Sequence, residues 1–316
     1  MELPKITDLE VAGKRVLLRL DLDIPPGDFS RIEAASQTLD YLKENQVEII
    51  ILGHRGRPTG DKEKDKDLSL LPLQPYFDKW GAKVEENLRF DPGEVANDPE
   101  FARKLALMGD VYVNEAFAVS HREHASIVGI PKFLPHAAGF RFIEEVAHLG
   151  KKFPKPVAVL ISGVKEDKVE MAKKLAKIYD KVLVGGRLPE YFGDEALVSI
   201  RSQNSDLLLG NLTTDKEDIT LNTIQRFKEE IKKAGTIILA GVLGRYEDEG
   251  HRQGTKEIFE AVAVSSAYKI AGGGDTEAAL TMFNLTAKFD WISVGGGAML
   301  EFLVSKTLPG IKALVE

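Results

Sequence analysis

The sequence predicts an α/β fold with two parallel-sheet domains, and three observations support this prediction. The chain has 316 residues, about twice the ~150 residues of an average domain. Short runs rich in Val, Ile and Leu alternate with amphipathic stretches along its whole length, which is the pattern of βαβ units. The charged segment 150–156 contains two prolines, and neither would continue a preceding helix. We therefore expect one domain at 1–150 and a second at 151–305.

The expected strands and helices follow in order from this alternation. In the first domain, apolar runs predict strands at 15–21, 47–52 and 111–117, and helical periodicity predicts helices near 33–43, 99–107 and 141–149. In the second domain, strands are expected at 157–161, 181–184, 236–239, 268–270 and 291–294. The run 61–67 alternates lysine with acidic residues and predicts a solvated loop without a function of its own.

Composition excludes several classes of function. The 43% of hydrophobic and 29% of charged residues are typical of a soluble globular protein, and no stretch has the ~18 apolar residues of a membrane span. The absence of cysteine excludes disulfides, thiolate metal sites and cysteine nucleophiles. The first residues lack a signal-peptide pattern, so a cytoplasmic enzyme is expected. A net charge of −7 argues against bulk nucleic-acid binding.

Two glycine triplets, 272–274 and 295–297, each follow an apolar strand and precede a helical pattern. Glycines at such a turn allow close approach of a ligand, and the free amides of the helix start attract an anion, which predicts phosphate binding. A tight turn without a ligand is the alternative. Asp275 and Thr276 favour a magnesium–nucleotide site, because phosphate would repel the carboxylate unless a divalent cation lay between them. Neither the dinucleotide fingerprint nor the P-loop pattern is present.

Arginines and histidines gather after the strands of the first domain, where a parallel sheet places its ligand crevice. They lie in the segments 19–25 with Arg31, 53–58, 86–90 and 114–124. A single such arginine is usually a surface residue or the partner of a carboxylate. Several such arginines together predict binding of a small polyanion such as a phosphorylated carboxylic acid. An acidic substrate on one domain and a nucleotide on the other imply phosphoryl transfer across a closing cleft.

The same segments resemble, in the same order, the motifs of the phosphoglycerate kinase family. That family writes R-V-D-F-N-V-P, H-L-G-R-P, E-N-L-R-F and V-N-D-A-F-G-x-x-H-R-x-H, and the first domain tracks all four. In the second half, 237–247, 271–276, 295–303 and the ending 308–310 resemble the nucleotide-domain motifs and the C-terminal tail of the family. The similarity extends from the first expected strand to the last residues.

The resemblance implies two Rossmann-like, three-layer α/β/α domains joined by a helix and hinge, with a substrate cleft between them and the tail 306–316 returning to the first domain. The implied residues that bind phosphoglycerate are Asp21, Asp23, Arg31, His54, Arg57, Arg89 and Arg122. The implied nucleotide-binding residues are Gly163, Lys165, Lys168, Gly185, Glu247, Gly272, Gly273, Gly274, Asp275 and Thr276. The implied catalytic residues are Arg31, Lys168, Gly273 and Gly274, and Asp275 would bind the metal.

The activity implied by the resemblance is reversible transfer of the acyl phosphate of 1,3-bisphosphoglycerate to ADP. The products are 3-phosphoglycerate and ATP, and Mg²⁺ accompanies the nucleotide. The implied protein is a cytoplasmic, hinge-bending monomer of glycolysis and gluconeogenesis whose partners are these small molecules, with neither nucleic acid nor membrane.

The sequence also departs from the family pattern, mostly in the second half. It is shorter than ordinary members, with deletions between 81 and 87 and between 191 and 218, where the family places parts of its adenine pocket. The family's G-A-K-x-x-D-K is one residue short at 163–168, which would rotate Lys168 by ~100° relative to Lys165 at a helix start. Asp23 replaces an asparagine and Asp91 a histidine.

Two alternatives therefore remain beside an active phosphoglycerate kinase. The eroded nucleotide segments suggest a non-catalytic relative that binds a phosphorylated acid as a sensor or scaffold. The extra negative charge of Asp23 near an anionic substrate suggests a kinase of altered nucleotide or acyl-phosphate specificity.

Overall fold

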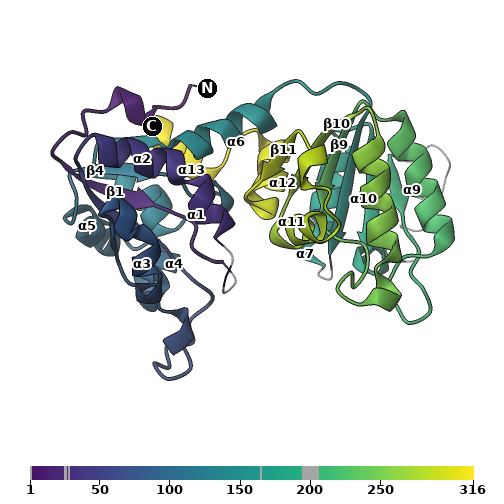
Figure 1. Cartoon of the computed structure of the whole chain (residues 1–316), viewed down its shortest axis with the longest axis horizontal. Helices are drawn as coiled ribbons and strands as arrows, with labels where there is room; N and C mark the ends of the chain where they lie inside the picture. Colours follow the sequence, from purple (N-terminus) through teal and green to yellow (C-terminus); the bar gives the residue numbers. More distant parts are fainter. Residues whose placement is uncertain (1, 25–26, 28, 164–165, 194–205) are drawn as a thin grey trace. The chain divides into compact units, whose positions relative to one another are not determined.

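The computed structural model describes residues 2–24, 27, 29–163, 166–193 and 206–316. These residues form two compact units (Figure 1). Unit 1 comprises Met1–Leu149 together with Thr307–Glu316, and unit 2 comprises Gly150–Lys306. The last residues of the chain thus return to the unit in which it begins.

Unit 1 is built on a parallel sheet in the order β3-β2-β1-β4-β5. Its described strands are β1 (Arg15–Arg19), β2 (Glu48–Leu52), β3 (Lys83–Val84), β4 (Val111–Asn114) and β5 (His136–Ala138). The central strand β1 places Val16 opposite both Ile49 of β2 and Val111 of β4. Both faces of this strand are buried, which is why its sequence is a continuous apolar run and not an alternating one.

Helices cover both faces of this sheet. The helices of unit 1 are α1 (Ser30–Ala34), α2 (Ser36–Glu44), α3 (Gln74–Phe77), α4 (Pro92–Val95), α5 (Pro99–Ala106), α6 (Phe140–Gly150) and α13 (Pro309–Val315). Leu39 of α2 and Phe77 of α3 join one core cluster with Val16 and Leu18 of β1. Successive side chains of a strand point to opposite faces, so the buried Leu17 faces away from this cluster. Figure 1 shows α2 and α5 on opposite sides of β1 and β4.

Unit 2 repeats the design with a parallel sheet in the order β11-β10-β9-β6-β7-β8. Its described strands are β6 (Val157–Gly163), β7 (Lys181–Gly186), β8 (Leu207–Leu209), β9 (Thr236–Ala240), β10 (Tyr268–Gly272) and β11 (Trp291–Ser293). Its described helices are α7 (Asp167–Ala176), α9 (Leu221–Lys233), α10 (Gln253–Val264), α11 (Gly274–Met282) and α12 (Gly296–Ser305).

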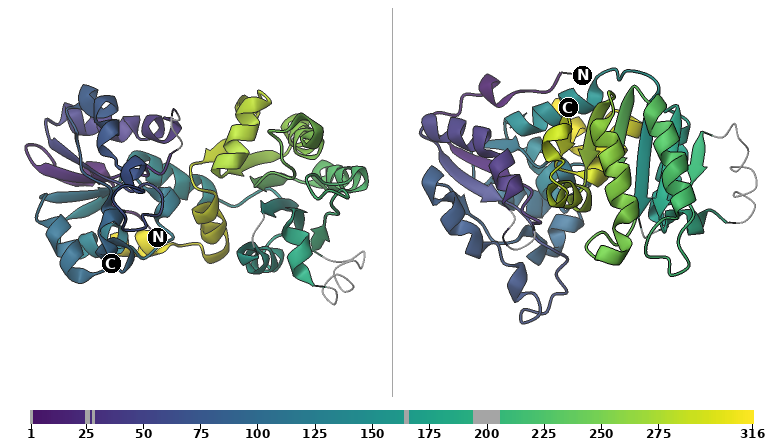
Figure 2. Two further views of the ribbon diagram at one scale, coloured as in Figure 1. Left: turned by 90° about the horizontal axis from the view of Figure 1, so that it is seen from below. Right: turned by 45° about the vertical axis from the view of Figure 1, so that its right-hand side comes forward.

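The helices of unit 2 also form two layers. Phe227 of α9, Phe259 of α10 and Leu280 of α11 pack in one core with Leu160 and Leu239 of the sheet. Helices α7 and α12 contact each other on the opposite face, and Figure 2 shows the sheet between the two helical layers. The predicted α/β fold with two parallel sheets is therefore confirmed.

Several predicted boundaries were wrong for local reasons. Strand β1 ends at Arg19 and not at Asp21, and β4 ends at Asn114 because the Asn114 side chain accepts from the Ala116 amide and turns the chain. The helix expected at 33–43 is two helices that meet at Ala35. The short strands β3, β5 and β8 were missed, since two or three residues show no periodicity. Within the described part of the chain, no helix is long and apolar enough to cross a membrane.

Candidate functional site

In the sheet of unit 1, the order in which the chain adds strands reverses between β1 and β4. Strands β2 and β3 lie on one side of β1, whereas β4 and β5 lie on its other side. In open parallel sheets, ligands bind beyond the carboxyl ends of the strands at such a point. The segments that follow β1, β2, β3 and β4 all meet at this edge, and they carry the predicted substrate residues.

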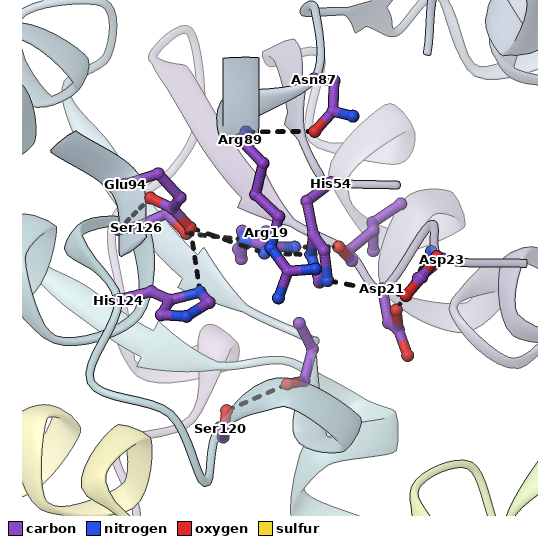
Figure 3. Close-up of polar contacts among 12 residues, drawn as sticks. Arg19, Asp21, Asp23, His54, Asn87, Arg89, Glu94, Ser120, His124 and Ser126 are labelled. Carbon is purple, nitrogen blue, oxygen red and sulfur yellow. Dashed lines mark hydrogen bonds and ion pairs between the residues drawn. The ribbon is translucent and has the colours of Figure 1, made fainter. Parts of the chain in front are cut away.

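A fully buried ion pair lies beneath this edge (Figure 3). Arg19, the last residue of β1, donates through Nε to Ser126 Oγ at 2.8 Å and lies 3.9 Å from Glu94 Oε1. Glu94 also accepts from the Ser126 amide at 2.9 Å and from Ser126 Oγ at 2.6 Å. Burial alone would raise the pKa of Glu94, but His124, Arg19 and Ser126 outweigh it and lower that pKa. Glu94 is therefore ionised and holds the Arg19 guanidinium.

His54 follows β2 and contacts the same arginine. Its Nδ1 lies 2.9 Å from Arg19 Nη2, and its ring is 1% exposed. The Nε2 atom has no hydrogen-bond partner among the described residues, and Asp23 Oδ2 lies 4.0 Å away. Burial, followed by the charges of Arg19 and Arg89, strongly lowers the pKa of His54, so the ring is neutral.

Two carboxylates border the cationic residues after β1. Asp21 is buried and accepts from Arg31 Nη1 and from the Asp23 amide at 3.2 Å. Burial raises the pKa of Asp21, and the Arg31 charge opposes that shift. Asp23 is more exposed, and its Oδ1 accepts from the Gly56 amide at 2.9 Å. Hydrogen bonds thus link the turn after β1 both to Arg31 and to the turn after β2.

The remaining predicted arginines differ in their surroundings. Arg89 donates through Nη1 to Gly56 O at 2.6 Å, while its buried Nε has no partner among the described residues. Burial and the nearby Arg122 lower the pKa of Arg89, so two cations lie close together. Arg122 donates through Nε to His121 Nε2 at 3.4 Å, and burial followed by the Arg122 charge lowers the pKa of His121 to about 4. Arg57 is exposed and forms no hydrogen bond or ion pair with these side chains.

A surplus of positive charge at this edge follows from these contacts. Glu94 pairs with Arg19 and Asp21 pairs with Arg31, whereas neither Arg89 nor Arg122 forms an ion pair within the described part of the chain, although Asp23 and Glu94 lie near enough to act on the charge of Arg89. Such an arrangement attracts a phosphate or carboxylate and would bind it by charge-assisted hydrogen bonds.

In the sheet of unit 2, the order in which the chain adds strands likewise reverses, between β6 and β9. Gly163 ends β6, and Lys168, in the first turn of α7, donates to Ser162 O at 2.7 Å. Gly241, directly after β9, donates its amide to Oγ1 of the buried Thr276 at 2.9 Å. Lys165 lies outside the described residues, so its predicted role stays a prediction.

The two glycine turns of unit 2 lie against each other. Gly273 has φ of 104° at the start of α11, a backbone conformation that glycine adopts readily and other residues rarely do. A Cβ atom on Gly296, at the start of α12, would lie 2.8 Å from Gly273 Cα, so no larger residue fits there. With Gly272 and Gly274, this turn presents main-chain amides at a helix start, as an anion site requires.

The predicted acidic residues of unit 2 lie close to that turn. Asp275 is exposed in the first turn of α11 and forms an ion pair with none of the described residues. Burial, followed by the charges of Glu247 and Asp275, raises the pKa of Tyr246 to about 12, which places both carboxylates around one phenol. Gly185 is buried in β7.

A cavity of about 520 Å³ lies in unit 2 beyond the ends of β7 and β8. Pro189, Leu209, Asn211 and Arg226 contribute to its wall. Its size is within the range of small-molecule sites.

Sequence reasoning missed the buried support of the cationic residues. Arg19 lies in a predicted ligand segment but is not among the predicted site residues, and the sequence motifs include neither Glu94 nor Ser126. One signal was available: an arginine inside an apolar strand must find a buried anion, since an unpaired charge there is costly. The identity of that anion depends on the tertiary fold.

Comparison with known proteins agrees with this arrangement. The phosphoglycerate kinase family model matches residues 6–85, 79–212 and 212–306. A phosphoglycerate kinase of Coprothermobacter proteolyticus is 33% identical over 390 residues, covering 100% of this chain and 99% of the relative. One from Haemophilus influenzae strain PittGG is 34% identical over 381 residues, covering 99% of this chain and 98% of the relative. Both alignments are longer than 316 residues, so the relatives contain segments that this chain lacks.

Solved structures give the same result. Phosphoglycerate kinase from Coxiella burnetii superposes with a TM-score of 0.82 at 30% identity, over 99% of each chain. The enzyme from Pyrococcus horikoshii superposes with a TM-score of 0.79 at 25% identity, over 98% of each chain. The chain therefore belongs to the phosphoglycerate kinase family and is a kinase.

Proposed function

We propose that the chain transfers the acyl phosphate of 1,3-bisphosphoglycerate to ADP, reversibly, forming 3-phosphoglycerate and ATP. The observation that carries this proposal is the pair Arg89 and Arg122, two neighbouring arginines that form no ion pair with a described residue and lie beside the neutral His54. A three-carbon acid with a carboxylate at one end and a phosphate at the other suits such a group, because each end can accept several charge-assisted hydrogen bonds.

In this proposal unit 1 binds the glycerate. Arg89, Arg122 and His54 bind its anionic groups, and Arg57 adds an exposed guanidinium that is free to turn toward a ligand. Asp21 orients Arg31, whose guanidinium would stabilise the transferring phosphoryl group. Phosphoryl transfer needs little covalent chemistry from the protein, so position and positive charge suffice.

Unit 2 binds the nucleotide in this proposal. The amides of the Gly272–Gly274 turn and the start of α11 would hold phosphates, and Lys168 would add charge. The exposed Asp275 carboxylate fits Mg²⁺, which proteins bind through one or two carboxylates while phosphates and water supply the other ligands. When bound, Mg²⁺ would neutralise charge on the phosphates.

The test is a coupled assay of the purified protein with 3-phosphoglycerate, Mg²⁺ and a panel of nucleoside triphosphates. We expect turnover that Arg122→Ala greatly reduces and that Arg15→Gln, a change at an exposed ion pair of the same unit, leaves unchanged. Binding of 3-phosphoglycerate, with no turnover in the presence of any of the nucleotides, would contradict the proposal and favour a non-catalytic binding protein.

A second candidate is a kinase for a different acyl phosphate, and Asp23 is the observation that favours it. Its carboxylate lies 4.0 Å from His54 Nε2 and would oppose an anion there. Substrates with a hydroxyl at this point would instead be preferred, because a carboxylate accepts hydrogen bonds. Higher kcat/KM for another acid phosphate in the same assay would support this candidate.

A further inference from the structure

The two ring nitrogens of His54 have opposite roles that its neighbours determine. Nδ1 lies 2.9 Å from Arg19 Nη2. A guanidinium has five donors and no acceptor, so this contact is a hydrogen bond only if Nδ1 is unprotonated and accepts. In a neutral ring, the proton must then be on Nε2.

Arg19 is unable to turn away from this contact. Its side chain is fully buried, and Nε donates to Ser126 Oγ while Nη1 donates to Leu20 O. Glu94 supplies the compensating charge at 3.9 Å. Each branch of the guanidinium is thereby anchored, and a guanidinium does not deprotonate in proteins.

The protonated face of His54 is the face that lacks a partner. Nε2 is buried, no described residue accepts from it, and Asp23 Oδ2 at 4.0 Å is beyond hydrogen-bond distance. Figure 3 shows the ring beside Arg89, on the side of the cationic group. A buried donor without an acceptor is unfavourable, so this position favours a ligand that brings an acceptor oxygen.

We propose that Arg19 is a positioning residue that holds His54 in the Nε2–H tautomer, so that a neutral imidazole donates to an anionic oxygen of the substrate. The identity of that anion as phosphoglycerate rests on the proposed function, whereas the tautomer does not. His54 then binds by a directed hydrogen bond and not as an imidazolium.

This distinction predicts how binding depends on pH. An imidazolium would lose affinity for an anion as the pH rises through its pKa, whereas a neutral donor contributes equally across the range. Burial and surrounding cations lower the pKa of His54, which agrees with the neutral form. Among the described residues, the charged and titratable groups that act on it are Arg19, Asp23, Arg89, Arg122 and His124. Glu94 lies behind them, 3.9 Å from Arg19 and 3.6 Å from His124.

Nitrogen-15 NMR of the whole ligand-free protein, labelled at histidine, tests the tautomer directly. We expect one ring, assigned by its loss in His54→Gln, with a bare Nδ1 and a protonated Nε2 that are unchanged from pH 6 to 9. Arg19→Lys keeps the positive charge but loses the planar guanidinium with its several donors. In this variant we expect both neutral tautomers of His54 to be populated. Circular dichroism verifies that this variant is folded. A protonated Nδ1 in the wild-type protein would overturn the proposal.

Two amide variants test the donor. His54→Gln can place an amide N–H near the position of Nε2, whereas His54→Asn reaches only the position of Nδ1. We expect the KM for 3-phosphoglycerate to rise less than about fivefold in His54→Gln relative to the wild type. In His54→Asn we expect a KM at least tenfold higher than that of His54→Gln, with kcat less affected in both variants. An equal or smaller rise in His54→Asn would overturn the proposal.

The pH profile separates the donor from a cation. The ratio of the wild-type KM to the His54→Gln KM cancels the titration of the substrate phosphate, whose second pKa is ~6. We expect this ratio to stay constant from pH 6 to 9, and a ratio that approaches one as the pH rises would identify an imidazolium. If the wild-type protein turns over no phosphoglycerate, the proposed function fails while the NMR result still decides the tautomer.

Discussion

Replacement of Glu94 by glutamine should destabilise unit 1 strongly, because it leaves the Arg19 guanidinium without its anion. Both side chains are fully buried. Breaking a buried pair by removing one partner costs about 3 to 5 kcal/mol. The lower end applies here, since the closest N–O distance is 3.9 Å and glutamine can still accept from Ser126. A loss of about 3 kcal/mol is a large part of the 5 to 15 kcal/mol that stabilise a typical domain.

Urea unfolding followed by tryptophan fluorescence measures this loss in unit 1 alone. The chain has two tryptophans, and Trp291→Phe leaves Trp80, which is buried in unit 1, as the reporter. At an m-value of roughly 2 kcal/mol/M, the Glu94→Gln midpoint should fall by about 1.5 M. Above about pH 4.5, the ordinary value for glutamate, the difference should be constant. It should shrink as Glu94 protonates through its lowered folded pKa.

Asp110→Asn is the matched control, because it makes the same chemical change at an exposed pair in the same unit. Asp110 accepts from Arg15 Nη2 at 2.8 Å, and both side chains are 43% exposed. The Arg15 hydrogen bond lowers the pKa of Asp110 to about 2, yet solvent and salt screen such pairs. We expect almost no midpoint shift. Equal shifts in the two variants, or a Glu94→Gln shift of only a few tenths of a molar, would refute the role assigned to the buried pair.

Three further changes have expected outcomes. Asp23→Asn should lower the KM for 3-phosphoglycerate up to about tenfold in steady-state kinetics. The reason is that the Asp23 carboxylate repels an anionic group of the substrate, and at ~6 Å and an effective dielectric of ~40 this repulsion costs about 1.4 kcal/mol. Burial raises the pKa of Glu115 to about 7, so unit 1 should lose stability as the pH rises from about 4.5 to 7, and Glu115→Gln should remove this slope in urea titrations. Hydrogen bonds to Asp215 and Asp248 raise the pKa of His251. The contribution of His251 to the stability of unit 2 is therefore complete below about pH 6.5 and is lost as the pH rises through the folded pKa. In His251→Gln, urea unfolding followed by Trp291 fluorescence should no longer show this loss of stability.

The sequence predicts elements well where burial imposes a long pattern. The continuous apolar runs of β1 and β2 are buried on both faces, and those runs are what the prediction used. The two-residue strand β3 joins the sheet only through its pairing with β2, so no local signal marks it. The helix break at Ala35 has no sequence signal either, since the residues on both sides are compatible with one helix.

The site divides in the same way between local and distant causes. Asp21 and Arg31 are ten residues apart and bind each other, and both lie in one stretch of the chain that was predicted to bind substrate. Arg19 and Ser126 are 107 residues apart, and Glu94 comes from a third segment. Only the tertiary fold brings these three together, and the sequence offers no periodicity or spacing from which to infer it.

The two units would hold their proposed ligands by different physical means, and this difference is consistent with the less complete sequence motifs of the second half. In unit 1 the charge comes from side chains, each of which needs a specific buried partner, as Arg19 needs Glu94. In unit 2 the Gly273 turn offers main-chain amides, which every residue carries, so the requirement falls on backbone conformation and on the close approach of Gly296. Side chains around such a turn can change without loss of the amides, whereas a single change beneath the arginines removes their support. A substitution at the half-buried Val242, within the 239–247 segment, should therefore cost less stability in urea unfolding than a substitution at the buried Glu94 or Ser126.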